Sequence, residues 1–443
     1  MDKSHVRATI LCSKAGGLQM RIRSGGHDYD GLSYVSDVPF VLLDMFNLRS
    51  IDIDLKDESA WVQSGATVGE LYYRIAEKSN VRGFPAGICP TLGVGGHFSG
   101  GGYGNMMRKY GLSVDNVVDA EVVDVNGNVL DRKGMGEDLF WAIRGGGAAS
   151  FCVVLSWKIK LVPVPEKVTV FQVEKTMEEG AVDLVVKWQE VADKLDENLF
   201  IRLMLSPTKI STKNSVKASF VAMFLGQSNS LLSLMNHSFP ELGLQQKDCI
   251  EMKWIESVPF WTGSPNGTQI DDLLIRESKR PVFLKRKSDY VQKPISKAAI
   301  ESIFKAIIES EYVGMLWNPY GGKMSEISES ETPFPHRAGN KFKIQYSVNW
   351  NEEGNDIVNK YLDRTRRLFG AMTPFVSKNP REAFLNYRDI DIGGNLNGTY
   401  DEGKVYGIKY FKNNFDRLVQ VKNKVDPENF FRYEQSIPTK NKA

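Results

Sequence analysis

Apolar residues in the first third of the chain follow helical spacing in some segments and strand spacing in others. The spacing of Val6 and Ile10 predicts a helix that ends near residues 16–17. Thr67 and Glu70 match the pattern of a capping box, which begins an amphipathic helix. Alternating apolar and polar side chains predict a strand over 18–23. We also expect strands at 39–43, 50–54, 60–63, 116–125 and 151–161, a helix at 137–143, and a hairpin at Asn126-Gly127.

The pattern changes at Pro163 and Pro165, because two prolines cannot continue a central strand. From residue 168 to about 403, alternating segments such as 200–204 and 216–225 mix with amphipathic helices such as 181–195. This mixture predicts a second, α+β domain. Apolar side chains at Phe411, Phe415, Leu418 and Val419 then predict a C-terminal helix within 405–424.

Glycine makes up eight of the eighteen residues in 87–104. We expect neither a helix nor a strand there, because glycine loses much backbone entropy on ordering. A flexible linker is disfavoured, because this stretch also carries Ile, Cys, Leu, Val, Phe and Tyr. Two further glycine turns lie at 23–27 and 144–149. Three such turns suit a long diphosphate cofactor that is bound by backbone amides.

The chain of 443 residues has 56 basic and 54 acidic side chains, which argues against a nucleic-acid or membrane-surface role based on bulk charge. No apolar run is long enough for a membrane span, and the first residues do not form a signal peptide. The four cysteines match no zinc or disulfide framework, and we expect no metal site. Candidate glycosylation sequons begin at Asn236, Asn266 and Asn397.

Neither a dinucleotide fingerprint nor a phosphate-binding loop is present, which disfavours a nicotinamide-dependent fold and a nucleotide hydrolase. His27 directly follows two glycines, and Cys89 lies in the glycine run. Each residue alone is compatible with a structural role. Together they suggest two nucleophiles directed at one electron-poor cofactor ring.

Several longer motifs resemble the plant berberine-bridge-enzyme-like family of FAD-linked oxidoreductases, and the resemblance extends from about residue 4 to 438. The motifs are 21–34 (RIRSGGHDYDGLSY), 87–91 (GICPT), 108–112 (RKYGL), 333–340 (PFPHRAGN), 385–389 (LNYRD) and 426–431 (DPENFF). The resemblance implies an α+β fold with an FAD-binding domain of the vanillyl-alcohol-oxidase (PCMH) type at 1–164. It also implies a substrate domain at 165–404, with an antiparallel sheet backed by helices, and a segment at 405–443 that returns to the FAD domain.

The resemblance also implies bicovalent FAD, with His27 bonded to the flavin 8α carbon and Cys89 to flavin C6. Such attachment holds the flavin ring and raises its reduction potential. The expected cofactor-binding residues, besides His27 and Cys89, are Arg23, Ser24, Gly25, Gly26, Tyr29, Thr91, Leu92, Gly93, Gly95, Gly96, Gly100, Gly101, Gly102 and Asn386.

Family members that oxidise alcohols carry Tyr, Lys and Gln at positions matching Tyr29, Tyr103, Lys343 and Gln345. Lys343 and Gln345 would share one face of a strand. We expect Tyr103, activated by the Lys343 ammonium, to take the hydroxyl proton during hydride transfer. Tyr387 is a second candidate base, as in cannabinoid-forming relatives. Apart from the resemblance, Lys343 would be interpreted as a solvated strand residue.

Leucine at position 92, where oxidases of the family tend to have valine, implies a dehydrogenase with an unknown electron acceptor. Full-length relatives have several tens of residues before Ser4, including a signal peptide and a cysteine that pairs with the one at Cys12. We therefore expect an N-terminally incomplete FAD domain and an unpaired Cys12. Relatives also have glycine where this chain has Cys152, whose side chain is expected to crowd a turn beside the diphosphate.

The expected activity is oxidation of an alcohol, with an aromatic allylic (monolignol-type) alcohol giving an aldehyde as the first choice. The alternative activity is oxidation of a sugar at its anomeric carbon. The non-enzymatic alternative is that the chain is a truncated, inactive flavoprotein-like product. The resemblance implies a secreted monomeric glycoprotein of the cell wall, apoplast or vacuole. We expect a small-molecule partner and no nucleic acid or membrane insertion.

Overall fold

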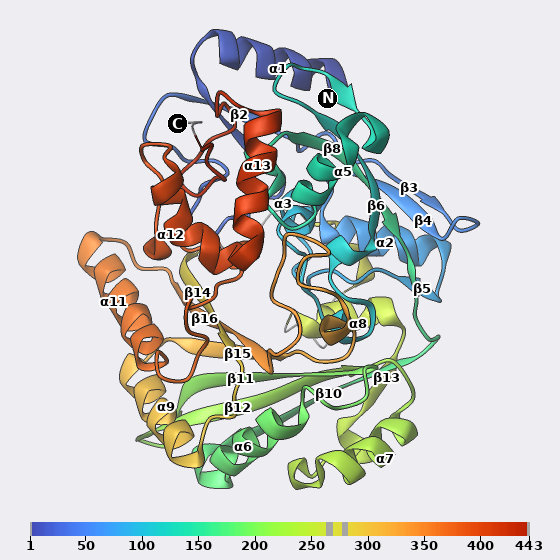
Figure 1. Cartoon of the computed structure of the whole chain (residues 1–443). Helices are drawn as coiled ribbons and strands as arrows, with labels where there is room; N and C mark the ends of the chain where they lie inside the picture. Colours follow the sequence, from blue (N-terminus) through green and yellow to red (C-terminus); the bar gives the residue numbers. More distant parts are fainter. Residues whose placement is uncertain (1, 263–268, 277–281, 441–443) are drawn as a thin grey trace.

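The computed structural model describes residues 2–262, 269–276 and 282–440. In this part of the chain the largest sheet has seven strands in the order β13-β10-β12-β11-β15-β16-β14 and is antiparallel throughout. A five-stranded sheet, β3-β4-β8-β6-β7, is formed by residues closer to the N-terminus. Two short ladders, β1-β2 and β5-β9, complete the topology. Figure 1 shows the two larger sheets in separate layers.

Strands occupy the following residues: β1 (Gln19–Arg23), β2 (Phe40–Asp44), β3 (Ile51–Asp54), β4 (Ser59–Gln63), β5 (Arg82–Gly83), β6 (Val117–Val123), β7 (Val129–Leu130), β8 (Val153–Lys160), β9 (Val162–Pro163), β10 (Val168–Thr176), β11 (Leu199–Ile210), β12 (Lys213–Phe224), β13 (Ile250–Met252), β14 (Phe283–Val291), β15 (Gly314–Pro319) and β16 (Phe342–Trp350). Helices occupy α1 (Lys3–Ala15), α2 (Val68–Lys78), α3 (Val94–Ser99), α4 (Met107–Tyr110), α5 (Arg132–Ile143), α6 (Ala181–Val191), α7 (Ser228–Ser238), α8 (Trp254–Trp261), α9 (Lys297–Ser310), α10 (Lys323–Glu326), α11 (Asn355–Ala371), α12 (Tyr400–Phe411) and α13 (Phe415–Val425).

Helices cover one face of the seven-stranded sheet, as the sequence predicts for this part of the chain. Apolar side chains of α6, α9 and α11 pack with those of β11, β12, β15 and β16 in one core. Trp188 on α6 illustrates the packing, because its indole lies against Trp317 and Phe342 and its N–H donates to the Ile201 carbonyl. The opposite face of the sheet is directed toward the N-terminal half of the chain and contributes side chains to a second core.

The C-terminal helices α12 and α13 pack beside the N-terminal half of the chain rather than beside the large sheet (Figure 1). The sequence predicts helix through 405–424, but the helix is interrupted at residues 412–414. Lys412 has φ of 48°, which allows the chain to turn there. The turn brings the Phe415 ring onto Gly407, where a Cβ atom would lie 2.2 Å from the ring. A close helix contact therefore replaces the expected continuous helix.

The glycine run also differs from its prediction, because residues 94–99 form the short helix α3. Val94 and Phe98 lie one turn apart, and both are fully buried in the core. Their burial compensates for the low helix propensity of the two glycines between them. By contrast, the helix α1, the strand β1 and the capping box that begins α2 lie where the sequence predicts them, with Thr67 and Glu70 each accepting the other's backbone N–H.

Candidate active site

A cavity of about 750 Å³ lies between the five-stranded and seven-stranded sheets and extends toward β1. Its wall includes many residues that the sequence places at a cofactor or catalytic site. These are Ser24, Gly25, Gly26, His27, Tyr29, Cys89, Leu92, Gly93, Gly95, Gly96, Gly100, Tyr103, Gln345, Asn386 and Tyr387. Residues far apart in the sequence are thus gathered around one elongated space.

His27 and Cys89 come from two loops that are joined to each other. His27 lies in the turn after β1, and its Nε2 is 2.8 Å from the Thr91 hydroxyl. The loop of Cys89 is fixed at the start of α2, where the Val68 and Gly69 amides donate to the carbonyls of Leu92 and Pro90. Both His27 and Cys89 present accessible side-chain surface to the cavity. The structure thus holds the two candidate attachment residues at the wall of the same space.

Two glycines allow these loops to pack closely. A Cβ atom on Gly93 would lie 2.1 Å from the Gly25 nitrogen, and a Cβ on Gly25 would lie 2.3 Å from the Gly93 nitrogen. No side chain larger than hydrogen fits at either position. A Cβ on Gly96 would meet nothing within 4 Å, because this residue faces the open cavity. The glycine run therefore both joins the two loops and leaves space beside them.

The cavity fits an FAD molecule by three observations. Its volume is large enough for a dinucleotide, within the usual range of ligand pockets of about 300–1,000 Å³. Arg388 lines it and has a buried Nη1 without a hydrogen-bond partner among the described residues. His27 and Cys89 are the side-chain types that can add to an electron-poor ring. The residues present therefore suit the flavin cofactor that the sequence predicts.

Partial removal from bulk water inside the cavity shifts the pKa values of the two nucleophiles. It lowers the pKa of His27, so the imidazole is neutral and carries a free electron pair at neutral pH. It raises the pKa of the Cys89 thiol, an effect that the nearby Arg202 and Arg286 guanidinium groups oppose. Burial outweighs the two guanidinium groups, so Cys89 is a thiol and not a thiolate at neutral pH.

Tyr103 follows the glycine run and extends toward the seven-stranded sheet. Its hydroxyl donates to Asn318 Oδ1 at 2.5 Å and accepts from Arg202 Nη2 at 2.7 Å. Arg202 Nε also donates to Asn318 Oδ1 at 2.8 Å, which closes a buried triangle of side chains from three segments. Burial raises the pKa of Tyr103, whereas the Arg202 charge and hydrogen bond lower it. Arg202 is thus the cation in direct contact with the Tyr103 hydroxyl.

Lys343 lies behind this group rather than on the hydroxyl. Its Nζ is 3.7, 3.9 and 4.2 Å from the ring centres of Tyr103, Phe384 and Tyr387. The ammonium is therefore enclosed by three aromatic faces, an arrangement that favours a cation. Its side chain is almost completely buried, and burial together with Arg202 lowers its pKa well below the usual value. Lys343 and Tyr103 lie close together as expected, but the Lys343 Nζ faces the ring of Tyr103 and not its hydroxyl.

The remaining predicted catalytic residues form one aromatic and polar wall. Gln345 donates to the Tyr29 hydroxyl at 2.9 Å, and the Tyr29 and Tyr387 ring centres are 5.8 Å apart. Tyr387 also meets Tyr103 edge-on, with 6.4 Å between the ring centres. Burial raises the pKa of Tyr29 to about 12 despite Arg286. Tyr29 is therefore a neutral hydrogen-bonding group at physiological pH.

Asn386 fixes the glycine run from the opposite side of the cavity. Its amide oxygen accepts from the Gly102 N–H at 2.9 Å, and its amide nitrogen donates to the Gly96 carbonyl at 3.2 Å. Gly102 has φ of 77°, and a Cβ atom there would lie 2.3 Å from the Ser113 side chain. The Asn386 side chain therefore positions backbone on which Tyr103 is carried.

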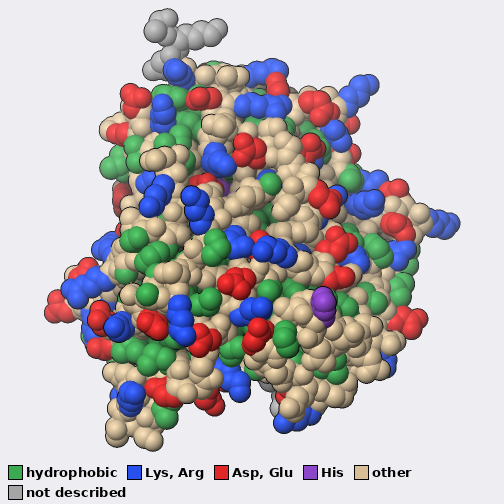
Figure 2. Space-filling view, turned by 60° about the horizontal axis from the view of Figure 1, so that its bottom comes forward, with side chains coloured by type: hydrophobic (Ala, Val, Ile, Leu, Met, Phe, Trp, Pro, Cys, Tyr) green, Lys and Arg blue, Asp and Glu red, His purple; other side chains and the backbone are tan. Residues whose placement is uncertain are grey.

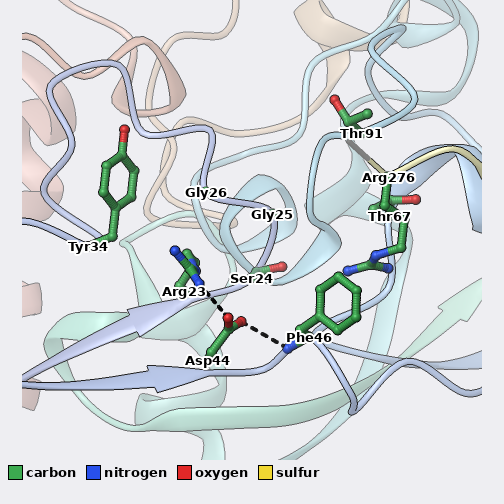
Figure 3. Close-up of a pocket in the computed structure, with 10 residues that line it drawn as sticks. All are labelled: Arg23, Ser24, Gly25, Gly26, Tyr34, Asp44, Phe46, Thr67, Thr91 and Arg276. Atoms are coloured by element: carbon green, nitrogen blue, oxygen red, sulfur yellow. Dashed lines mark hydrogen bonds and ion pairs between the residues drawn. The ribbon is translucent and has the colours of Figure 1, made fainter. Parts of the chain in front are cut away.

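Some predicted site residues do not line this cavity: the cofactor residues Arg23, Thr91, Gly101 and Gly102 and the catalytic residue Lys343. Arg23 and Thr91 instead line a smaller pocket of about 350 Å³ on the other side of the glycine turn at 24–26. Figure 3 shows Arg23 bonded to Asp44, whose carboxylate also accepts the Phe46 backbone N–H. The Arg23 side chain is therefore directed toward β2, away from the main cavity.

The cysteines and sequons have the following environments. All four cysteines are free, including the exposed Cys12. Cys152 is buried in the cavity wall, and its backbone does not adopt the positive φ that would require glycine. Asn236 on α7 and Asn397 are exposed, whereas Asn266 lies outside the described residues. The crowding expected from Cys152 thus concerns its side chain in the cavity and not backbone strain.

Sequence reasoning missed Arg202, Asn318 and Arg286, which all line or support the cavity. They lie on ordinary alternating strands of the large sheet, and no local motif marks them. The only signal that could have marked these residues is the burial of an arginine within a predicted strand. No grouping of side chains suited to a metal ion occurs among the described residues. No described helix combines the length and apolar character of a membrane span.

Comparisons with known proteins agree with this geometry. The FAD binding domain family matches residues 2–132, and the family described as "Berberine and berberine like" matches residues 383–438. Berberine bridge enzyme-like 14 from Arabidopsis thaliana is 68% identical over 439 residues, which cover 98% of this chain and 82% of that protein.

Two grass proteins of known structure share the fold. The Bermuda grass pollen isoallergen BG60 is 52% identical, with a TM-score of 0.95 over 99% of this chain and 89% of that one. The grass pollen allergen Phl p 4, described as having glucose dehydrogenase activity, is 46% identical, with a TM-score of 0.94 over 99% and 89% of the two chains. The α+β fold, with an FAD-binding domain and a substrate domain built on a large antiparallel sheet, is thereby confirmed. The chain belongs to the plant berberine bridge enzyme-like family of FAD-binding oxidoreductases.

Proposed function

We propose that the protein oxidises an alcohol to a carbonyl compound, with Tyr103 as the base. The observation that carries the proposal is the Arg202 guanidinium, which donates to the Tyr103 hydroxyl in the cavity that also contains His27 and Cys89. A tyrosine is a poor base at neutral pH, because its pKa is about 10. A charged donor on its oxygen favours the phenolate and so makes the residue usable.

Each side chain of the group then has a defined task. Tyr103 takes the proton of the substrate hydroxyl, and Arg202 stabilises the phenolate that must exist beforehand. Asn318 accepts from the guanidinium and fixes its direction, while the Lys343 Nζ lies below the Tyr103 ring. FAD, when bound, accepts the hydride that leaves the carbinol carbon. Tyr29 and Gln345 offer hydrogen bonds that orient the substrate.

We further propose that FAD is attached through both His27 and Cys89. The Thr91 hydroxyl engages His27 Nε2, which leaves Nδ1 as the ring nitrogen free for attachment. The neutral imidazole supports nucleophilic addition by His27, and the position of Cys89 at the wall of the same cavity supports its role as the second attachment residue. Residues 24–26 and 93–96 would lie beside the diphosphate, since they combine backbone amides with an absence of side chains.

For the substrate, an aromatic allylic alcohol remains our first proposal, because Tyr29, Tyr387 and Trp261 give the cavity aromatic walls. A sugar oxidised at its anomeric carbon is the second proposal, supported by the described glucose dehydrogenase activity of Phl p 4. Leu92 in the cavity wall supports a dehydrogenase. An isoleucine-to-valine variant of Phl p 4 is described as a glucose oxidase and the wild type as a glucose dehydrogenase, so one side-chain carbon can alter the acceptor in this family.

The test is anaerobic mixing of the purified protein with cinnamyl-type alcohols and with aldoses. Loss of the visible flavin absorbance with an alcohol, and its return with an artificial electron acceptor, is the expected result. A protein that carries flavin but is not reduced by any member of the panel would contradict alcohol oxidation. A colourless protein would instead contradict flavin binding. Secretion and glycosylation at Asn236 and Asn397 remain predictions, which a mass shift on deglycosylation of the plant-expressed protein would test.

A further inference from the structure

The cavity wall formed by β14 and β16 carries one arginine that the proposed chemistry does not use. In the register of these strands Tyr290 pairs with Lys343, Ser288 with Gln345 and Arg286 with Ser347. Directly paired residues of antiparallel strands lie on the same face of the sheet. Arg286 is therefore on the face that carries Lys343 and Gln345, and it lines the cavity beyond Gln345.

All the side-chain contacts of Arg286 in the described structure are with neutral groups. Its Nη1 donates to the backbone carbonyls of Lys285 and Val348 at 3.0 and 2.6 Å, and its Nη2 donates to Asn349 Oδ1 at 2.6 Å. Its guanidinium carbon is 5.7 Å from the centre of the Tyr29 ring. Among the described residues, Arg286 forms no ion pair.

Among the residues that the structure describes, the charged groups of β14 and its neighbouring loops pair with one another and not with Arg286. On the other face of β14, Lys285 and Lys287 pair with the carboxylates of the two neighbouring loops, and Arg366 completes this network. Three basic groups there meet three acidic groups: Asp30, Asp389 and Asp391. Two further carboxylates each have their own arginine: Asp28 with Arg388 and Asp289 with Arg381.

An unpaired guanidinium in a low-dielectric wall is costly unless a ligand supplies the opposite charge. Its planar set of donors matches a carboxylate, which it can bind through two parallel hydrogen bonds. The geometry points to Arg286 as a specificity subsite for a carboxylate on the substrate, at a position remote from the carbon that is oxidised. This inference rests on the proposed alcohol oxidation and names the class of alcohol: one that carries a carboxylate.

The position of Arg286 sets how far the carboxylate lies from the reacting carbon. Tyr29 contacts both the guanidinium and the ring of Tyr387, which lies beside Tyr103. The substrate would therefore place its carboxylate beside Tyr29 and its hydroxyl beside Tyr103, so the two groups lie at opposite ends of the molecule. Both a sugar acid and an aromatic acid meet this requirement, and the experiment distinguishes them.

The experiment compares pairs of substrates that differ only in a carboxylate: glucuronate with glucose, and a ring-carboxylated cinnamyl alcohol with cinnamyl alcohol. We expect the wild type to prefer one carboxylated compound at least tenfold in kcat/KM. Arg286→Leu should raise the KM for that compound more than tenfold with a smaller change in kcat, and should leave the neutral partner within about twofold. Arg286→Lys should retain part of the preference, because it keeps the charge but not the two parallel donors. Arg74→Leu, a surface substitution with the same change in net charge, is the matched control.

A second readout does not require turnover. Calorimetry of the flavin-loaded protein measures binding of 4-methylbenzoate, which carries its carboxylate on the ring, against 4-methylbenzamide, and of glucuronate against glucose, in the wild type and in Arg286→Leu. The subsite is supported if the carboxylate binds more tightly than its neutral partner in the wild type and this difference in affinity is lost in Arg286→Leu. Equal affinity within both pairs, or an advantage that survives Arg286→Leu, overturns it. A protein that binds a carboxylate through Arg286 but oxidises no alcohol would contradict the proposed function and not the subsite.

Discussion

Replacing Arg202 by methionine tests the assignment of Tyr103 as the base. Arg202 is 5% exposed, and its guanidinium donates to the Tyr103 oxygen at 2.7 Å and to Asn318 Oδ1 at 2.8 Å. Methionine keeps much of the side-chain volume but removes the charge and both donors. Arg202→Lys is the partner variant, since it keeps a charge without the fork that reaches Tyr103 and Asn318 together.

The expected loss follows from the contact distance. Two unit charges about 4 Å apart interact by about 4 kcal/mol at an effective dielectric constant of about 20. Removal of Arg202 therefore destabilises the phenolate and raises the pKa of Tyr103 further above its usual value. Loss of one donor to a developing oxyanion costs enzymes about 100- to 1,000-fold in rate. We therefore expect flavin reduction by the alcohol to slow by about 100-fold or more in Arg202→Met.

The pH dependence has a defined sign. Burial raises the pKa of Tyr103 above its usual value, and Arg202 opposes that shift. The active phenolate is therefore populated as pH rises, so the rate of flavin reduction should increase with pH toward the alkaline range. Arg202→Met should move this ascending limb to higher pH, and Arg202→Lys should move it less.

The assay is anaerobic stopped-flow measurement of flavin bleaching across pH, with Arg74→Met as a surface control. An unchanged limiting rate and an unchanged ascending limb in Arg202→Met would refute the assignment of Arg202. A normal rate in Tyr103→Phe would refute the base itself.

Three further predictions concern the rest of the site. Leu92→Val should open the cavity wall and raise the rate of hydrogen peroxide release in air at least tenfold, while substrate-driven flavin reduction changes little; an unchanged oxidation rate would exclude Leu92 as the barrier to oxygen. Lys343→Met should lower turnover, because it removes the Nζ group beneath the Tyr103 ring. Full turnover in this variant would contradict a role of Lys343 in activating Tyr103. Thr91→Val should reduce attachment at His27, as measured by peptide mass mapping, and Thr91→Ser should restore it; equal attachment in the valine variant would contradict the hydrogen-bond argument.

Local patterns were sufficient for elements whose determinants lie within a few residues. The capping box at Thr67 and the alternation before Arg23 are examples, because side-chain spacing and backbone capping act over one turn or one strand. The conformation of the glycine run at 87–104 was harder to predict. Its composition indicated close approach of the backbone, but part of that approach is between Gly93 and Gly25 and not toward a ligand. Composition alone does not distinguish these two causes.

The site itself was predictable only where a long family motif carried it. His27 and Cys89 lie in such motifs, Tyr103 was carried over from a matching family position, and all three line the cavity. Arg202 and Arg286 lie on strands far along the chain, and the pairing of those strands alone brings them to the same wall. Their importance comes from burial and from missing counter-charges, which are properties of the folded molecule.

The central claim is that this cavity holds FAD through His27 and Cys89. Mass spectrometry of the denatured and then digested protein tests it most directly. The account predicts an intact mass increased by one FAD, and a single flavin-linked species that joins the His27 peptide to the Cys89 peptide. Both peptides at their unmodified masses, with all flavin released into the supernatant after denaturation, would contradict it.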